Sequence, residues 1–213
     1  MALDKATLIA SLTAAFADVT AGKTAAQAAT QVADAIDVYV KSGATTRRYL
    51  GTIRITGTIG QCEDSILKRY VFNYHHSLAR PMSAIEATNS WTYATATWRQ
   101  ANAASGNKVE YICGVSEALV AAEVLANALL INAYGTVGIG VDSTSANSAR
   151  VSVGRAYNLA TVRLGIQASY RGFPGVGYHY LAWLEHCSFG TATFYGDDGS
   201  TEMQSGITAE VWG

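Results

Sequence analysis

The sequence predicts a mainly β protein: an antiparallel β-sandwich or jelly-roll-like body preceded by a short N-terminal α-helical hairpin. Alanine dominates the first 43 residues, whereas short alternating segments separated by turn residues fill the remainder. Helical periodicity is almost absent after residue 45, which favours a sandwich or jelly roll. We expect the hairpin at residues 1–44 and the body at residues 45–213, with a division of the body into two β subdomains left open.

The N-terminal segment carries two apolar stripes at helical spacing. They comprise Leu8, Leu12, Phe16 and Val19 in the first helix and Ala28, Val32, Ile36 and Tyr39 in the second. Gly22 separates the helices, a capping-box pattern at residues 24–27 begins the second, and Gly43 ends it after Lys41. Because alanine makes these stripes thin, the helices are weakly stable alone. We therefore expect the hairpin to be a docking or attachment element.

The rest of the chain contains a series of segments with strand character. In order, they are RRYLGTIRITGTIG, ILKRYVFNYHH, SWTYATATWRQ, KVEYICGV, TVGIGV, LATVRLGIQASY, GYHYLAWLEHCSF, TATFYG and GITAEVWG. Turn residues separate them at 105–107, 142–148, 172–177 and 197–199. Residues 118–132 have the alanine and leucine content of a helix, but their even positions form an unbroken apolar strand face. The alternation leads us to expect a strand there.

The composition bears on partners and location. The net charge is −1 and no basic stripe occurs, so we expect no nucleic-acid partner. The most apolar window, residues 118–131, contains Glu123 and Asn127 and is too short and polar to span a membrane. The N-terminus does not match a secretory signal. Only 15% of residues are charged and 49% are hydrophobic, which predicts a surface covered by neighbouring copies or partners.

The three cysteines, Cys62, Cys113 and Cys187, are odd in number and far apart, and no CxxC motif occurs. This pattern predicts three free thiols, buried as small apolar groups, in a protein made in a reducing cytoplasm.

The stretch GVGYHYLAWLEHC, residues 175–187, is the strongest candidate for a metal or catalytic site. On a strand, His179 and Glu185 share one face but lie six residues apart, roughly 20 Å, while His186 points to the other side. Such a separation exceeds the about 3 Å of a proton transfer. A metal site would need His75 and His76 from another strand. We therefore expect core aromatics and partly buried histidines, with no metal, cofactor or catalytic residue.

Other motifs are weaker. AGKT at residues 21–24 resembles the end of a P-loop, but Ala17 stands where that loop needs glycine. GTVGIG at residues 135–140 lacks dinucleotide-binding spacing and predicts close strand packing. The paired acids Glu63-Asp64 and Asp197-Asp198 do not form a dyad within one strand, although a glycosidase dyad across two strands stays open. No GxSxG elbow occurs, so we expect no enzyme.

Residues Ala84–Val124, Val137–Ala149 and Pro174–Gly213 together resemble the β-rich modules of tailed-bacteriophage virion proteins. Such modules occur in capsid decoration (cement) proteins, head fibres and tail fibres, and the N-terminal ADAIDVYVKSG is similar to the opening of many phage structural proteins. The resemblance implies a homotrimer that acts by adhesion, has no catalytic residues and joins the virion in the host cytoplasm.

Two roles compete within that family. A decoration protein clamps the major capsid protein or another virion protein, whereas a fibre adhesin binds host surface glycans. The chain has no shaft repeat, collagen-like run or coiled-coil heptads, which favours a compact capsid knob. We expect a trimeric capsid decoration protein; the alternative is a fibre adhesin, and a sugar-cleaving enzyme ranks below both.

Overall fold

The computed structural model describes residues 40–41, 44–57, 61–151, 153–156, 163–200 and 202–213. The chain divides into two compact units, Met1–Leu50 and Gly51–Gly213. The described part of the first unit contains strands β1 (Val40–Lys41) and β2 (Ala44–Arg48), which pair antiparallel. The predicted helical hairpin otherwise lies outside the described residues. Its predicted last turn is wrong at Val40 and Lys41, where neighbouring β-branched residues favour strand pairing.

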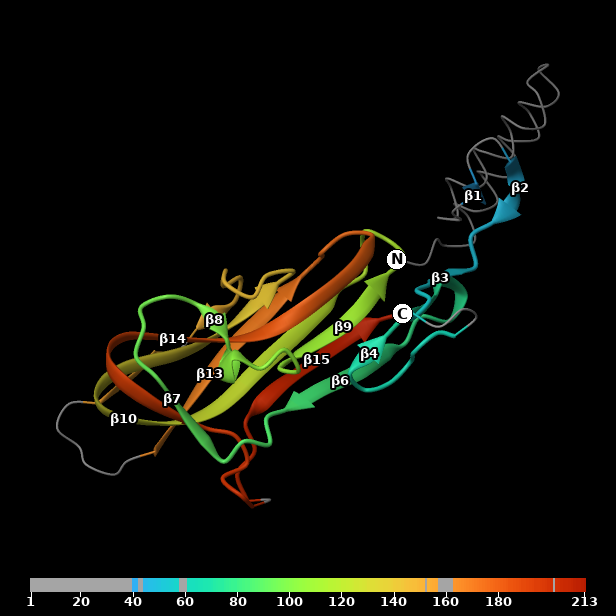
Figure 1. Ribbon diagram of the computed structural model, residues 1–213. Helices are drawn as coiled ribbons and strands as arrows, with labels where there is room; N and C mark the ends of the chain where they lie inside the picture. The colour runs from blue at the N-terminus through green and yellow to red at the C-terminus, as the bar shows by residue number, and fades with distance from the viewer. Residues whose placement is uncertain (1–39, 42–43, 58–60, 152, 157–162, 201) are drawn as a thin grey trace, which may run out of the picture. The chain divides into compact units, whose positions relative to one another are not determined.

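The second unit is mainly β, and all but one of its strand pairs are antiparallel (Figure 1). Its strands are β3 (Gly51–Ile53), β4 (Lys68–Arg69), β5 (Val71–Asn73), β6 (Ala79–Ile85), β7 (Ser90–Tyr93), β8 (Arg99–Gln100), β9 (Lys108–Cys113), β10 (Val120–Val141), β11 (Arg150–Val151), β12 (Val153–Ala156), β13 (Arg163–Gly172), β14 (Gly177–Tyr195) and β15 (Gly206–Trp212). Two short 3₁₀ turns, η1 (Tyr74–His76) and η2 (Ala101–Ala103), are the helical elements of the described residues.

Two long strands, β10 and β14, organise an 11-stranded sheet. They run side by side (Figure 1), with residues 127–141 of β10 paired against residues 181–195 of β14. The first part of β10 also pairs with β13 on one edge and β15 on the other. Along the edge opposite β10, β14 pairs in turn with β9, β8 and β7. Each long strand thus pairs with different neighbours along its two halves.

The core follows from alternation along these strands. The even positions of β10 from Val120 to Leu130 are buried, and the odd positions are partly or fully exposed. This confirms the strand expected over residues 118–132, although β10 begins at Val120. The largest fully buried side chains include Trp183, Tyr111 and Phe194. Their burial excludes apolar surface from water and stabilises the body.

A bulge bends both long strands at the same level. The register between β10 and β14 shifts between Ile131 and Tyr134, where Asn132 has a φ of 47°. Across the pair, Gly190 has a φ of 69°. A Cβ at Gly190 would lie 2.3 Å from the carbonyl oxygen of Asn132, so only glycine fits there without distortion.

Five strand predictions require correction. ILKRYVFNYHH divides into β4, β5 and the turn η1, and RRYLGTIRITGTIG divides into the end of β2 and the short strand β3. TVGIGV is not separate but forms the end of β10, and TATFYG forms the end of β14, because bulges bend these strands without interrupting them. SWTYATATWRQ divides into β7 and β8. The sequence analysis missed β6, which contains Pro81. That proline is tolerated because β6 pairs only with β15 and is an edge strand.

Candidate functional site

The stretch expected to form part of the core lies almost wholly within β14. His179, Glu185 and Cys187 are buried on one face, as the strand reading predicts. The ring of His186 lies on the other face, 4.9 Å from that of Trp98. His75 and His76 lie in the exposed turn η1. Within the described part of the chain, no three His, Cys, Asp or Glu side chains gather as metal ligands.

His179 forms a pair with Asp142, the residue that directly follows β10. Its Nδ1 lies 2.7 Å from Asp142 Oδ2, and its Nε2 lies 3.2 Å from the carbonyl oxygen of Gly175. Asp142 Oδ1 also accepts a hydrogen bond from the backbone N–H of Tyr180 at 2.9 Å. Because both ring nitrogens face oxygen atoms of the chain, neither is directed at a substrate. The pair anchors the loop between β13 and β14.

Cys113 on β9 lies near this pair and could act as a nucleophile. It pairs with Gly177, which lies two residues before His179 on β14. Burial raises the pKa of the Cys113 thiol to about 11, and the nearby Asp142 carboxylate adds to this shift. The thiol is therefore protonated at neutral pH, which makes it a poor nucleophile. The geometry does not assemble a Cys–His–Asp catalytic site.

All three cysteines are free thiols, as predicted. Cys113 and Cys187 are buried, and Cys187 Sγ lies 3.2 Å from the carbonyl oxygen of Phe189. The prediction of burial is wrong for Cys62, which is exposed because it lies in the chain preceding β4 rather than in the central sheet.

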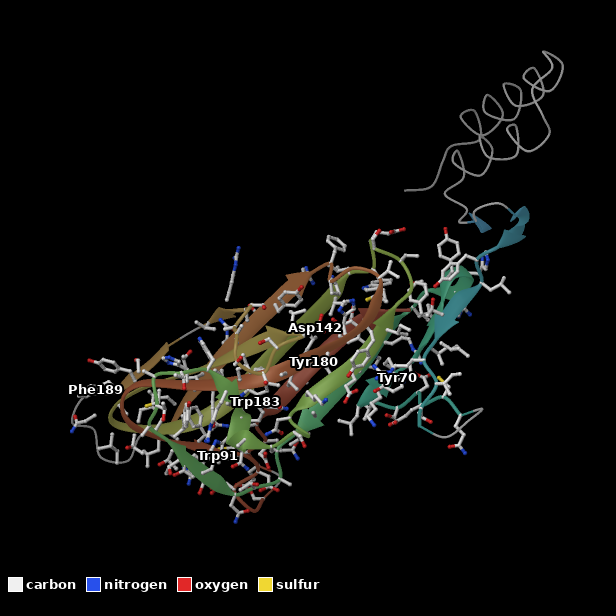
Figure 2. The ribbon with its side chains drawn as sticks, turned by 45° about the horizontal axis from the view of Figure 1, so that its top comes forward. Tyr70, Trp91, Asp142, Tyr180, Trp183 and Phe189 are labelled. Atoms are coloured by element: carbon white, nitrogen blue, oxygen red, sulfur yellow. The ribbon has the colours of Figure 1, made fainter. Side chains whose placement is uncertain are left out.

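Glu185 is a fully buried carboxylate beneath the aromatic core. It accepts hydrogen bonds from Trp91 Nε1 at 2.5 Å and Arg99 Nε at 2.7 Å. The Trp91 and Trp183 rings meet edge to face with centroids 5.8 Å apart, and Figure 2 shows both tryptophans together. Burial raises the pKa of Glu185, and the bonds from Trp91 and Arg99 offset part of that increase. The carboxylate ties β14 to β7 and β8.

Glu110 centres a second cluster, which joins β9 to the segment around β4. Its carboxylate accepts hydrogen bonds from Tyr70 at 2.5 Å and Tyr178 at 2.7 Å, and pairs with Lys108 at 3.0 Å. Burial opposes ionisation, but these contacts outweigh it and lower the pKa of Glu110 to about 2. The guanidinium of Arg54 stacks 3.4 Å from the Tyr178 ring centroid. The cluster fastens Arg54 and Tyr70 to β9 and β14.

The two acid pairs that sequence analysis singled out are engaged elsewhere. Glu63 pairs with Lys68 at 3.0 Å, and Asp64 pairs with Arg69 and Arg80. Their partners show that this pair holds the loop before β4. Asp197 Oδ1 accepts the backbone N–H of Gly199, and Asp198 pairs with Arg163 at 2.5 Å. Neither pair faces a second carboxylate in the described contacts.

The glycine-rich segment at residues 135–140 packs closely, as predicted. A Cβ at Gly140 would lie 2.0 Å from the carbonyl oxygen of Ser143, and one at Gly138 would lie 2.5 Å from Asn147 Oδ1. These glycines admit the loop that follows β10. The P-loop-like residues 21–24 lie outside the described part.

Exposed apolar side chains gather where β13 and β15 end. Gly172 and Val211 pair with Val120 from opposite edges, so the next residues, Phe173 and Trp212, flank the start of β10. We define the apolar end by four exposed residues: Leu78, Phe173, Val176 and Trp212.

Phe173 is 63% exposed, Val176 is 64% exposed and Trp212 is 42% exposed. Leu78 exchanges backbone hydrogen bonds with Gly213 and so lies beside Trp212. A hollow of about 270 Å³ adjoins Trp212 and is lined mainly by apolar residues, which include Phe72, Val115 and Leu119. Exposed apolar groups beside such a hollow are typical of a protein-binding surface. The sequence did not reveal this surface, because its residues come from three separate segments.

Comparison with known protein families finds no matching family model, and comparison with curated proteins finds no significant match. Among the described residues, no helix has the length and apolar character needed to cross a bilayer.

Proposed function

We propose that this chain is a structural protein of a tailed-bacteriophage virion. In this proposal it is a trimeric capsid decoration protein that stabilises the shell through protein–protein contacts. The body adopts a β-sandwich of jelly-roll type, and the N-terminal α-helical hairpin attaches it to the major capsid protein or another virion protein. Assembly takes place in the host cytoplasm.

The observation that carries the proposal is the apolar end. Phe173, Val176 and Trp212 expose large apolar side chains on a chain in which only 15% of residues are charged. Covering apolar surface contributes roughly 25 cal/mol per Å², so contact between copies or with a shell protein would stabilise the assembly. The phage-like β modules, which include Phe173's neighbour Pro174 and the C-terminal Trp212, point to a virion as that setting.

The ionisable clusters support a structural role. Glu185 joins three strands, Glu110 fastens the segment around β4, and the His179–Asp142 pair anchors a loop. Each of these groups is satisfied by its neighbours in the chain. They give the body a fixed shape, which a protein acting through shape and surface requires.

A substitution at the apolar end tests the proposal. Phe173→Asp and Trp212→Asp should each abolish the trimer in light scattering and leave species no larger than a pair of 22.5 kDa chains, because a charge at a buried contact is unfavourable. Both variants should retain the β-type circular dichroism and should fail to bind capsid shells made without this protein.

Phe189→Asp is the matched control. Phe189 is also an exposed aromatic residue, 54% accessible, but it lies at the bend of β14. This variant should stay trimeric and bind shells. A wild-type protein that is monomeric at micromolar concentration contradicts the trimer. If the wild-type protein does not bind capsid shells but binds host glycans on an array, the result favours the fibre adhesin instead.

A further inference from the structure

The outer face of the sheet formed by β6, β15, β10, β13 and β11 is hollowed and open to solvent. The hollow has a volume of about 830 Å³ and is lined mainly by residues of β10, β13 and β15, with Arg150 from β11. The opposite face of these strands carries buried residues such as Val124 and Ile166. We call the following residues the polar sheet face: Ala121, Glu123, Arg150, Ser169, Arg171, Thr208 and Glu210.

Strand register arranges the polar sheet face in two rows. The first row across the strands is Thr208, Glu123, Ser169 and Arg150, and the second is Glu210, Ala121 and Arg171. In each row a carboxylate and a guanidinium lie two strand spacings apart, about 10 Å at the backbone. The acids stand on β10 and β15, and the bases stand on β11 and β13. The face therefore has an acidic half and a basic half.

These four charged side chains are not paired within the described part of the chain. Glu123, Arg150, Arg171 and Glu210 do not contribute to any of its ion pairs. By contrast, other exposed charges of the body, such as Arg163 and Asp198, pair with each other. The small side chains of Ala121 and Ser169 separate the acids from the bases and leave the hollow between them.

We propose that the polar sheet face binds the same face of a second copy of this chain through a two-fold axis. The axis runs parallel to the strands, midway between the two facing sheets and over the space between β10 and β13. Such a rotation exchanges the two halves of the face, so the acids of each copy meet the bases of the other. An isologous contact of this kind uses one self-complementary patch twice.

The direction of the axis follows from the charges. An axis perpendicular to the strands would place acidic half on acidic half, which is repulsive. The parallel axis keeps each row at its own level and lays β10 of one copy over β13 of the other. Glu123 then lies one strand spacing to the side of Arg150 of the second copy, and Glu210 one spacing to the side of Arg171. Facing sheets pack about 10 Å apart, a gap that an arginine and a glutamate side chain can bridge together.

The adjoining row supports the same axis. Ile85 and Leu125 are about half exposed and lie on either side of Gly206, which pairs with both. Because the axis preserves rows, Leu125 of one copy approaches Leu125 of the other near the axis. Apolar groups then meet apolar groups beside the ion pairs, and the contact gains specificity from the charges and stability from the leucines.

This contact does not depend on the trimer proposed above, because it uses the polar sheet face and leaves the apolar end free. Charge exchange in trans tests it. The double variants Glu123→Arg/Glu210→Arg and Arg150→Glu/Arg171→Glu make the face wholly basic or wholly acidic. Each should weaken association through this face by about tenfold or more at low salt, and mixing the two should restore it.

Association is read by energy transfer between dyes on the exposed Cys62. A mixture of the donor-labelled basic variant and the acceptor-labelled acidic variant should show energy transfer. A mixture of donor-labelled and acceptor-labelled samples of the same variant should show only the transfer that results from subunit exchange within trimers. In 1 M salt the excess should vanish, because the Debye length falls to about 3 Å. Glu202→Arg, which reverses an exposed charge outside the face, should behave as wild type.

Two results overturn the proposal: no excess transfer in the mixed sample, or double variants that associate as tightly as wild type. Light scattering distinguishes this failure from failure of the proposed function. A protein that lacks only the two-fold contact is still a trimer, whereas a protein that does not form the trimer is found as single chains or as pairs. Circular dichroism of each double variant verifies that it is folded.

Discussion

At the scale of single residues, Glu110 and Glu185 carry the same carboxyl group in opposite environments. Glu110 accepts two tyrosine hydroxyls and pairs with Lys108, so its pKa falls to about 2 from 4.5. Glu185 is buried more deeply, and its pKa rises. A lowered folded-state pKa contributes stability above pH 4.5 that is lost as the pH falls toward 2. The raised pKa of folded Glu185 has the opposite effect: it contributes to the free energy of unfolding at low pH, and this contribution is lost as the pH rises.

Glu110→Gln should therefore lower the free energy of unfolding by roughly 2 kcal/mol at pH 7, after a discount for partial exposure. The difference from wild type should shrink steadily as the pH falls from 4.5 toward 2.5, because the carboxyl group of the unfolded wild-type chain takes up a proton there while folded Glu110 stays largely ionised. Urea unfolding at pH 7, 4 and 3 measures this. A difference that stays constant across that range would show that the Glu110 charge is not what stabilises the cluster.

Glu185→Ala should lower the free energy of unfolding by about 3 kcal/mol or more, because Trp91 Nε1–H loses its acceptor inside the core and a cavity remains. Glu185→Gln should be less harmful, since it retains an acceptor oxygen and its neutral amide avoids burying a charge. Chemical denaturation at neutral pH compares the two variants. The exposed Glu202→Ala is the control and should change stability by less than about 0.5 kcal/mol; an equally small effect at Glu185 contradicts the assigned role.

Strand alternation predicted part of this residue-level arrangement. It correctly placed His179, Glu185 and Cys187 on one buried face of β14. It could not find their partners, because Trp91 lies 94 positions from Glu185 and Asp142 lies 37 positions from His179. Those contacts depend on strand order, which local periodicity does not encode. The four charges of the polar sheet face were missed for the same reason.

At the scale of elements, the bends of β10 and β14 were the hardest feature to predict. The apolar alternation over residues 118–132 identified a strand, but Asn132 and the following glycines imitate a turn between two strands. The structure keeps the chain in the sheet through a bulge, and Gly190 on β14 makes room for it. Local composition therefore located the bend but could not distinguish a bulge from a loop.

Gly190→Ala should destabilise the body by about 1–3 kcal/mol, since a side chain there is both strained and in contact with the Asn132 carbonyl oxygen. Gly165→Ala is the matched control, because a Cβ at Gly165 in β13 meets no atom within 4 Å. That change should be neutral or slightly stabilising. Thermal unfolding of both variants provides the comparison, and equal melting temperatures would show that the bulge does not require glycine.

At the scale of the whole molecule, the chain divides into two compact units between Leu50 and Gly51. The residues whose burial the structure describes form a core within the unit that begins at Gly51, and all four tryptophans lie in that unit. Tryptophan fluorescence therefore reports on that unit alone. If its core is self-sufficient, removing the first 50 residues should leave its cooperative unfolding intact, because the contacts that bury its core are internal.

A chain comprising residues 51–213 should consequently fold, with the β-type circular dichroism of the full protein and a free energy of unfolding within about 0.5 kcal/mol of it. In the proposed virion role, this chain should also lose incorporation into particles, since the N-terminal segment is the attachment element. The double substitution Phe16→Asp/Ile36→Asp in the full chain should reproduce that loss without truncation. A truncated chain that is unfolded would show that the first 50 residues complete the main core. One that folds and still enters particles would place attachment on the β body, and Arg54 and the strands beside it become the next segment to test.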